Sequence, residues 1–182
     1  MDTIMPYPIL FLMLGYPGSG KTTAARHLEA LTGATHLWAD QRRREYFVRP
    51  HFTAEENTYL YDALNREVDL LLSERKSVIY DTSFNYYEDR QKMREIAQPY
   101  GARVLLIYVK TPHQVAYQRA SNTGDQPTRV LGAMEATHFA HLRRSLQIPA
   151  EHEDTLELDG QQITAEYVRT ALQAASSVIA RD

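Results

Sequence analysis

The sequence predicts an α/β protein with a parallel sheet, because short apolar segments alternate along the chain with longer amphipathic ones. The short segments have the length and hydrophobicity of buried strands, and they are Ile9–Leu14, Thr35–Ala39, Ser77–Tyr80, Arg103–Val109 and Thr155–Leu158. The longer segments carry apolar residues at helical spacing, and they are Lys21–Leu31, Ala54–Ser73, Glu88–Gln98, His113–Ala120, Arg129–Leu146 and Ile163–Ile179. A chain of 182 residues is long enough for one such domain around one core.

The individual segments support this prediction in chain order. Ile9–Leu14 is a continuous apolar run, which is typical of a parallel strand that is buried on both faces. The run imitates the core of a signal peptide, but no Lys or Arg precedes Lys21 and there is no small-residue cleavage site. In Ala54–Ser73, leucine and valine recur at a helical spacing, which predicts an amphipathic helix. The turn-rich stretch 121–127 lies between two helical segments, and it is either a surface loop or a mobile lid.

The composition excludes several classes of protein. Hydrophobic residues make up 43% of the chain and charged residues 24%, which excludes a disordered, collagen-like or membrane-spanning chain. The net charge of −3 provides no overall basic field, so binding to nucleic acid or to a membrane would need a local patch. The absence of cysteine excludes disulfides, thiolate catalysis and cysteine-ligated metal sites. We therefore expect a cytoplasmic protein that does not bind membranes.

The segment after the first predicted strand carries the clearest chemical signal. Residues 15–22 read Gly-Tyr-Pro-Gly-Ser-Gly-Lys-Thr, a full match to the pattern G-x-x-x-x-G-K-[ST]. In such a loop the glycines let successive backbone N–H groups point at phosphate oxygens, and the following helix adds the positive end of its dipole. Lys21 can reach the β- and γ-phosphates, and the Thr22 hydroxyl can coordinate Mg²⁺. The predicted nucleoside triphosphate site consists of Gly15, Tyr16, Pro17, Gly18, Ser19, Gly20, Lys21, Thr22 and Thr23.

Other patterns narrow the class of nucleotide-binding protein. The chain has no N-K-x-D motif for reading guanine, which disfavours a GTPase switch. It is short for a motor ATPase, and Asp81 is followed by Thr82 rather than by the glutamate that is typical of such motors. A small phosphotransferase is the best remaining interpretation.

These residues resemble the small P-loop kinases that are grouped with the bacteriophage polynucleotide kinase domain, the zeta toxins and chloramphenicol phosphotransferase. The resemblance runs from Leu10 to about Leu158. It is carried by Gly15–Thr22, Asp40-Gln41-Arg42-Arg43, Asp81-Thr82-Ser83-Phe84-Asn85 with Arg90, Arg119 with Asn122, and the helix through Met134 towards Pro149. It implies a three-layer α/β P-loop NTPase sandwich whose five-stranded parallel sheet has the order 2-3-1-4-5. We further expect one domain over residues 1–182, with a small helical lid around residues 119–130.

Asp40 follows the second predicted strand, at the edge where parallel sheets collect ligands. A carboxylate there can accept the proton of an attacking hydroxyl. In the resembled family the aspartate at this position is the general base, and the arginine three residues later, here Arg43, binds phosphate on the acceptor. Two alternatives stay open: Asp40 only caps a helix, and the cluster Arg42–Arg44 with Arg49 is a solvated helix face rather than an anion site.

Asp81 closes the third predicted strand. In the implied topology this strand lies next to the first strand, which precedes the predicted phosphate-binding loop. It is a candidate to hold Mg²⁺ through a water molecule or to contact the acceptor, and the sequence leaves both roles open. Asn85 is a further candidate for binding the acceptor at the same rim. This stretch also has the composition of an ordinary turn. Arg90 can be read as part of a charged helix start, and residues 151–154 as a solvated loop.

Arg119 and Arg129 flank the turn-rich stretch. In the resembled family, lid arginines fold over the phosphates and stabilise charge on the transferring group. The family pattern expects a second arginine soon after Asn122, where this sequence has Thr123-Gly124-Asp125. Arg129 is a candidate to take that role from the far side of the lid.

The expected function is transfer of the γ-phosphate of ATP, with Mg²⁺, to a hydroxyl group. The candidate catalytic residues are Lys21, Asp40, Arg119 and Arg129, the candidate acceptor ligands are Asp40, Arg43, Asp81 and Asn85, and the candidate metal ligands are Thr22 and Asp81. A small hydroxyl compound is the first choice of acceptor, and the 5′-hydroxyl of a nucleic acid is the second. The alternative of a different class is a non-catalytic, nucleotide-binding module or a toxin-like regulator.

Overall fold

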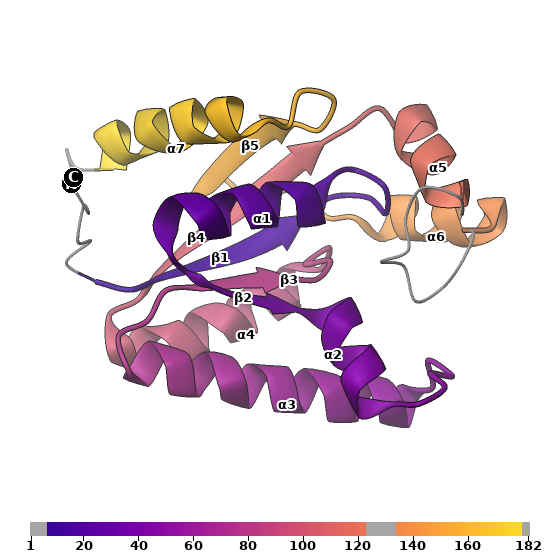
Figure 1. Cartoon of the computed structure of the whole chain (residues 1–182), viewed down its shortest axis with the longest axis horizontal. Coiled ribbons are helices and arrows are strands. Elements are labelled where there is room, and N and C mark those ends of the chain that lie inside the picture. The colour runs from indigo at the N-terminus through magenta and orange to yellow at the C-terminus, as the bar shows by residue number, and fades with distance from the viewer. Residues whose placement is uncertain (1–6, 123–133, 180–182) are drawn as a thin grey trace.

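The computed structural model describes residues 7–122 and 134–179, which form one five-stranded parallel sheet with helices on both faces (Figure 1). The strand order is β2-β3-β1-β4-β5, which confirms the expected topology. The strands are β1 (Ile9–Leu14), β2 (Thr35–Trp38), β3 (Val78–Asp81), β4 (Arg103–Lys110) and β5 (Thr155–Asp159). The helices are α1 (Lys21–Thr32), α2 (Ala39–Tyr46), α3 (Ala54–Ser73), α4 (Tyr87–Ala97), the 3₁₀ turn η1 (Gln98–Tyr100), α5 (His113–Ser121), α6 (Ala136–Ser145) and α7 (Ala165–Ile179).

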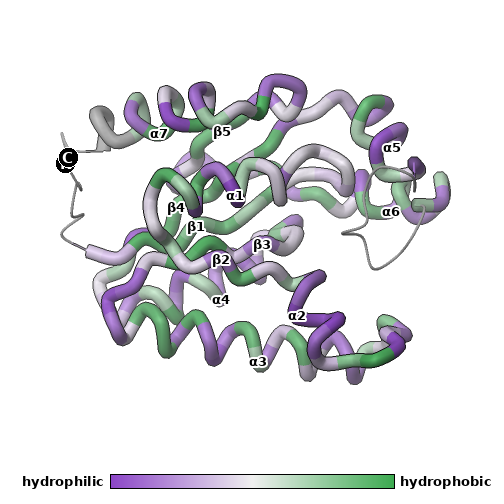
Figure 2. Tube along the Cα trace, in the orientation of Figure 1, coloured by the Kyte–Doolittle hydropathy of each residue, from purple (hydrophilic) through white to green (hydrophobic). Residues whose placement is uncertain are grey.

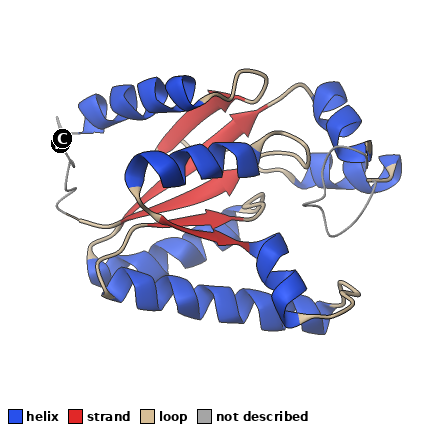
Figure 3. Cartoon of the chain, in the orientation of Figure 1, coloured by secondary structure: helices blue, strands red, loops and turns tan. Residues whose placement is uncertain are grey.

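The sheet is the middle layer of three, and each of its faces is covered by helices (Figure 3). Phe11 and Met13 of β1 pack in the core under α1 and α7, whereas Leu10 and Leu12 pack in the core over α3 and α4. Because side chains alternate along a strand and both faces are covered, every residue of β1 is buried. Figure 2 shows this as hydrophobic colour along the central strands. Within the described ranges, no helix has the length and apolar character needed to cross a bilayer.

Helix α2 was not predicted as an element of its own. Its eight residues are mostly charged and lack an apolar stripe, and only Ala39 and Arg43 are buried. The structural reason for the helix is therefore the position of this segment at the end of β2, rather than its own hydrophobic pattern.

The segment before β5 also departs from the prediction of a helix over Arg129–Leu146. Helix α6 begins at Ala136, with Glu135 as its N-cap. The N–H group of Met134 donates to the carbonyl of Ala120 at 3.1 Å. This residue therefore contacts α5 and is not part of a helix. The remainder of the predicted start, residues 129–133, lies outside the described residues.

Candidate functional site

The loop after β1 packs tightly against its surroundings and opens towards the start of α1. The backbone φ is +145° at Gly15 and +78° at Gly18, conformations that residues with a Cβ rarely adopt. A Cβ on Gly18 would overlap the Ala116 carbonyl of α5, so this close packing needs glycine. Helix α1 begins at Lys21 and has no side-chain cap at Gly20. The first N–H groups of the helix can therefore bind an anion, as the sequence motif predicts.

Lys21 reaches back over this loop. Its Nζ donates to the carbonyl oxygens of Gly15 and Tyr16, both at 2.8 Å. The loop is also braced by the residue that follows β4, because the Thr111 hydroxyl donates to the Ser19 carbonyl at 2.8 Å. The Ser19 hydroxyl is buried without a hydrogen-bond partner in the described part of the chain. The two hydrogen bonds from Lys21 hold its ammonium group against the loop that the motif predicts to bind phosphate.

The carboxylates of Asp40 and Asp81 lie at the carboxyl edge of the sheet, near enough to each other and to Lys21 for the charges of Asp81 and Lys21 to affect the pKa of Asp40. β2 and β3 are neighbours, and their register pairs Trp38 with Asp81, so Asp40 lies just beyond that pair. Burial, and then the negative charge of Asp81, raise the pKa of Asp40, while Arg43, Lys21 and Arg44 act in the opposite direction. The fold thus gathers a lysine, two carboxylates and an arginine from three separate segments of the chain.

Asp40 does not cap α2 in the way considered from the sequence. The N-cap is Trp38, and no side chain caps the first turn by a hydrogen bond. Asp40 lies inside the first turn, where a carboxylate interacts favourably with the helix dipole. The interpretation of Asp40 as a simple N-cap is therefore wrong, and its carboxylate is available for another role.

Asp81 has a buried partner that the sequence analysis missed. Its Oδ2 atom lies 3.1 Å from Nε2 of His36, a residue of β2. The available signal was a histidine within a short strand, two positions before the only tryptophan, but nothing local connects it with a residue 45 positions away.

Arg43 is buried and held by residues of α3 and the loop before it. Its Nη2 donates to Asn57 Oδ1 at 2.7 Å, its Nη1 lies 4.0 Å from Glu56 Oε2, and its guanidinium lies 4.6 Å from the centre of the Phe52 ring. Nη1 is buried without a hydrogen-bond partner among the described residues. This atom is a donor that a bound molecule could satisfy.

The loop that carries Phe52 is fixed by hydrogen bonds to two side chains at the start of α3. The Thr53 hydroxyl accepts a hydrogen bond from the N–H of Glu56, and the Glu56 carboxylate accepts bonds from the N–H groups of His51 and Phe52. Phe52 has a φ of +58°, which is rare for a residue with a side chain. The T-x-x-E pattern of residues 53–56 was visible in the sequence and could have located this helix start.

The basic cluster around Arg42 is largely paired inside the protein. The guanidinium of Arg42 contacts Glu45 at 2.9 Å and forms a second ion pair with Glu67. With Arg43 held by Asn57 and Glu56, two of the cluster's arginines have protein partners. The cluster therefore has fewer guanidinium groups available to bind an anion than its sequence indicates.

The loop between β3 and α4 places Asn85 next to the segment that follows α6. Asn85 is buried, and its carbonyl accepts the N–H of Gln147 at 2.8 Å. Its side-chain Oδ1 is buried with no hydrogen-bond partner in residues 7–122 and 134–179. At the start of the same loop, the Thr82 hydroxyl and the Tyr61 hydroxyl lie 3.2 Å apart.

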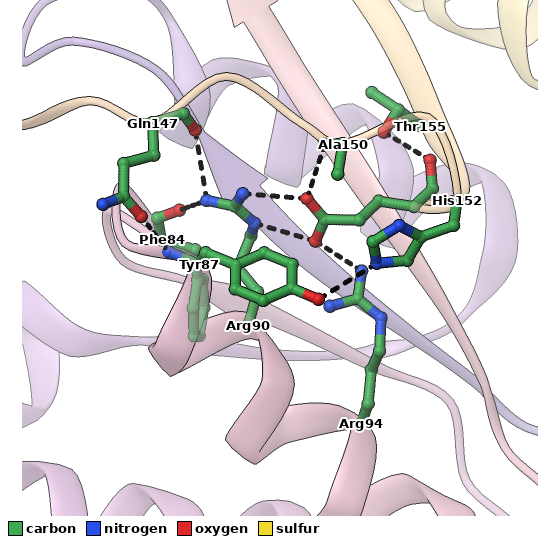
Figure 4. Close-up of polar contacts among 9 residues, drawn as sticks. Phe84, Tyr87, Arg90, Arg94, Gln147, Ala150, His152 and Thr155 are labelled. Atoms are coloured by element: carbon green, nitrogen blue, oxygen red, sulfur yellow. Dashed lines mark hydrogen bonds and ion pairs between the residues drawn. The ribbon is translucent and has the colours of Figure 1, made fainter.

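A buried ionic network holds this loop in place (Figure 4). Arg90 of α4 binds both oxygens of Glu153 at 2.9 and 2.8 Å and donates to the carbonyls of Phe84 and Gln147. Arg94 adds a third contact with the same carboxylate, at 2.6 Å. The side chains of Arg90 and Glu153 are both 0% exposed. The interpretation of residues 151–154 as a solvated loop is therefore wrong at Glu153, and Arg90 is more than part of a charged helix start.

The electrostatics of this network follow from its hydrogen bonds. Burial alone would raise the pKa of Glu153, but hydrogen bonds from Arg90, the Ala150 N–H and Arg94 outweigh it and lower the pKa to about 2. The carboxylate is therefore ionised at neutral pH and joins α4 to the segment before β5.

The predicted lid is described only in part. Arg119, on α5, donates from Nη1 to the Gly160 carbonyl at 2.8 Å, in the turn after β5. A Cβ on Gly160 would meet the Ser19 carbonyl, so this turn lies against the loop after β1. Arg129 and most of the predicted lid lie outside the described residues. Of the motif's threonines, Thr22 is half-buried in the first turn of α1 and Thr23 is exposed.

Comparison with known proteins gives a family match and a set of similar folds. The model of a family described as an AAA domain matches residues 10–149. A search of curated proteins gives no match. Three similar solved structures show what proteins share the fold.

A gluconokinase from Sinorhizobium meliloti 1021 is 20% identical, with a TM-score of 0.67 and coverage of 96% of this chain and 95% of that one. The APS kinase CysC of Mycobacterium tuberculosis, solved with AMPPNP and APS, is 17% identical, with a TM-score of 0.63 and coverage of 93% and 98%. A chain of the Pnkp1/Rnl/Hen1 RNA repair complex is 20% identical, with a TM-score of 0.66, and the match covers 80% of this chain and 46% of that chain. At these identities the likeness shows a common fold.

Proposed function

The chain belongs to the AAA domain family matched over residues 10–149, a family of P-loop kinase-like proteins, and we propose that it transfers the γ-phosphate of Mg·ATP to a hydroxyl group of a small acceptor. The observation that carries this proposal is the position of Asp40. Its partly desolvated carboxylate lies at the sheet edge, close enough to Lys21 and Asp81 for both charges to affect its pKa. A base beside a phosphate-binding lysine is the arrangement that transfer to a hydroxyl requires.

The nucleotide site would use the loop amides and Lys21 for the phosphates. For Mg²⁺, Thr22 and Asp81 offer hydroxyl and carboxylate oxygens, the donors that this ion prefers. The described residues contain no cluster of three or more His, Asp or Glu side chains that would hold a metal alone. A site of this kind does not need one, because phosphate oxygens and water complete the coordination. The bound ion would neutralise charge on the phosphates during transfer.

In the proposed reaction, the acceptor oxygen forms a bond to the γ-phosphorus while the bond from that phosphorus to the β–γ bridging oxygen breaks. The acceptor proton moves to the Asp40 carboxylate, and ADP leaves with the electron pair of the broken bond. The raised pKa of Asp40 makes it a better proton acceptor than an ordinary aspartate, provided that it is ionised at the working pH. Lys21 stabilises negative charge on the transferring group.

Arg119 is proposed to cover the γ-phosphate. In the structure its guanidinium is held by the Gly160 carbonyl, next to the phosphate-binding loop, so it would have to exchange this bond for the phosphate. Arg129 remains the proposed second lid arginine. The role of Arg119 is supported by the resemblance and by the position of α5 at the carboxyl end of the sheet, and the role of Arg129 by its place in the sequence on the far side of the lid.

A small acceptor with few or no phosphates is favoured by the pairing of the arginine cluster. Arg42 is neutralised by Glu45 and Glu67, and Arg43 is held by Asn57 beside Glu56. Arg43 Nη1, which is buried without a hydrogen-bond partner among the described residues, would then bind a hydroxyl or a single anionic group of the acceptor. A 5′-hydroxyl nucleic acid remains the second candidate, because one chain with the same fold belongs to an RNA repair complex.

Transfer of γ-labelled phosphate distinguishes these acceptors. The protein is incubated with Mg²⁺, labelled ATP and either a 5′-hydroxyl oligonucleotide or a pooled library of small hydroxyl metabolites, with Lys21→Ala as the blank. Label in the metabolite pool would support the proposal and identify the acceptor by mass. Label in the oligonucleotide, with binding that weakens steeply as salt rises, would favour the polynucleotide alternative. Binding of ATP with no transfer to either would favour a non-catalytic or toxin-like protein.

A further inference from the structure

A buried histidine, His36, contacts Asp81, which is one of the candidate metal ligands. The side chain of His36 is 8% exposed and that of Asp81 is 3% exposed, and Nε2 of the histidine lies 3.1 Å from Oδ2 of the aspartate. An ionised carboxylate can only accept hydrogen bonds, so this hydrogen bond forms in the tautomer that carries a proton on Nε2. The contact fixes one of the two carboxylate oxygens of Asp81.

The imidazole ring has two further close neighbours. Its Nδ1 lies 3.5 Å from Glu29 Oε2 of α1. The ring also stacks on Trp38, with 6.4 Å between the ring centres and 19° between the planes. The guanidinium of Arg26 lies 5.4 Å from the centre of the same tryptophan ring. Helix α1 and strand β2 therefore both restrict the orientation of the histidine.

The strand pattern shows which part of the site Asp81 serves. Ile79, two residues earlier in β3, packs in the core cluster beneath α1. Because side chains alternate along a strand, Asp81 lies on that same face, with His36 and Glu29. Thr22, the other candidate metal ligand, is in the first turn of α1, whereas Asn57, which holds Arg43, comes from α3 on the opposite face. The face thus assigns Asp81 to the metal side rather than to the acceptor side.

We propose that His36 is a positioning residue for the magnesium site: by holding Oδ2 of Asp81 it leaves Oδ1 for the ion or for a water bound to it. This inference rests on the proposed function, since it needs an Mg·nucleotide complex at the loop after β1. Groups that hydrogen-bond to metal-binding side chains commonly affect metal affinity without touching the metal. His36 would act in that way, through Asp81.

The test measures nucleotide binding rather than turnover. A fluorescent ATP analogue is titrated across a range of Mg²⁺ concentrations and in EDTA for the wild type, His36→Leu and His36→Gln. The glutamine amide can place an N–H group near the position of Nε2, so it keeps the donor. His27→Leu makes the same chemical change at a half-buried position of α1 and serves as the control.

We expect His36→Leu to raise the Mg²⁺ concentration for half-maximal binding about tenfold, while affinity in EDTA changes less than about twofold. His36→Gln should stay within about threefold of the wild type in both conditions, since it restores the hydrogen bond. In an Asp81→Asn background the effect of His36→Leu should shrink strongly, because the histidine acts through that aspartate.

Four results would overturn the inference. The first is a His36→Leu variant with the Mg²⁺ dependence of the wild type. The second is an equal loss of nucleotide affinity with Mg²⁺ and in EDTA for both His36 variants, because such a loss indicates that His36 has only a structural role. If His36→Leu does not fold, a wild-type Mg²⁺ dependence for Asp81→Asn gives the same answer, because Asp81 then does not serve the ion. A wild-type protein that binds no nucleotide overturns the proposed function as well, and this separates the two failures.

Discussion

The carboxylate of Asp40 is the residue on which the proposed chemistry depends most, and its pKa gives a testable pH profile. A general base works in its ionised form, so kcat/KM should fall as the pH drops through the raised pKa of Asp40. The fall should begin at a higher pH than for an ordinary aspartate. Because Arg44 lowers this pKa, Arg44→Gln should raise it and move the acid limb to still higher pH.

The measurement is the pH profile of kcat/KM for the wild type and Arg44→Gln. Arg169→Gln removes an exposed arginine that pairs with Glu166 on α7 and should leave the profile unchanged. An acid limb that stays in place in Arg44→Gln would show that a group other than Asp40 controls it.

Glu153 is a second residue whose charge has a measurable consequence, in this case for stability. Its pKa falls from the ordinary 4.5 to about 2 in the folded protein, so its stabilising effect is present above 4.5 and is lost as the pH falls towards about 2. Glu153→Gln should lower the free energy of unfolding at neutral pH by on the order of 3 kcal/mol, because it leaves the buried Arg90 and the half-buried Arg94 without their counter-ion. Urea denaturation at a series of pH values measures both effects.

The matched control is Glu157→Gln, which breaks the exposed pair with Lys110. Exposed pairs contribute little, so its effect on unfolding should be far smaller than that of Glu153→Gln. Equal losses in the two variants would contradict a structural role for the buried network.

At the scale of single elements, the start of α3 connects stability with the acceptor site. Thr53→Ala removes the cap on Glu56, whose carboxylate holds the loop of Phe52 and lies beside Arg43. We expect a loss of about 1 kcal/mol in the free energy of unfolding, together with a higher KM for the acceptor. Thr53→Ser keeps the hydroxyl and should restore both values. An alanine variant with unchanged stability and KM would refute the coupling.

The elements themselves were predictable to different degrees. Strands such as Ile9–Leu14 and Arg103–Val109 were visible because buried parallel strands are continuous apolar runs. Helix α2 was not, because its charged residues carry no periodic pattern and it packs through Ala39 and Arg43. The start of α6 was placed too early because helical spacing alone does not show where a chain bends to contact α5.

At the scale of the whole molecule, the parallel sheet brings Lys21, Asp40 and Asp81 to one edge. Sequence reasoning could predict this gathering, because all three follow or close a strand and neighbouring parallel strands end together. It could not predict the partners that fix these groups. His36 lies 45 positions from Asp81, and Arg90 lies 63 positions from Glu153, so only the folded chain shows these contacts.

Nucleotide binding should stabilise the whole fold, because the loop after β1 contacts both β4 and α5. At a Mg·ATP concentration of about 100 times Kd, linkage gives about 2.7 kcal/mol of stabilisation. For a domain of this size that corresponds to a rise in Tm of roughly 5–10 °C. Differential scanning calorimetry with and without Mg·ATP measures it, and Lys21→Ala should show little or no rise. A similar rise in this variant would place the nucleotide elsewhere.

The most direct test of the central claim compares phosphate transfer and nucleotide binding in Asp40→Asn. This change keeps the size of the side chain and removes its basicity. We expect the variant to bind Mg·ATP within about threefold of the wild type but to transfer γ-labelled phosphate to the acceptor about 10²–10⁴ times more slowly. Transfer at the wild-type rate in Asp40→Asn would contradict the claim that this carboxylate activates the acceptor hydroxyl.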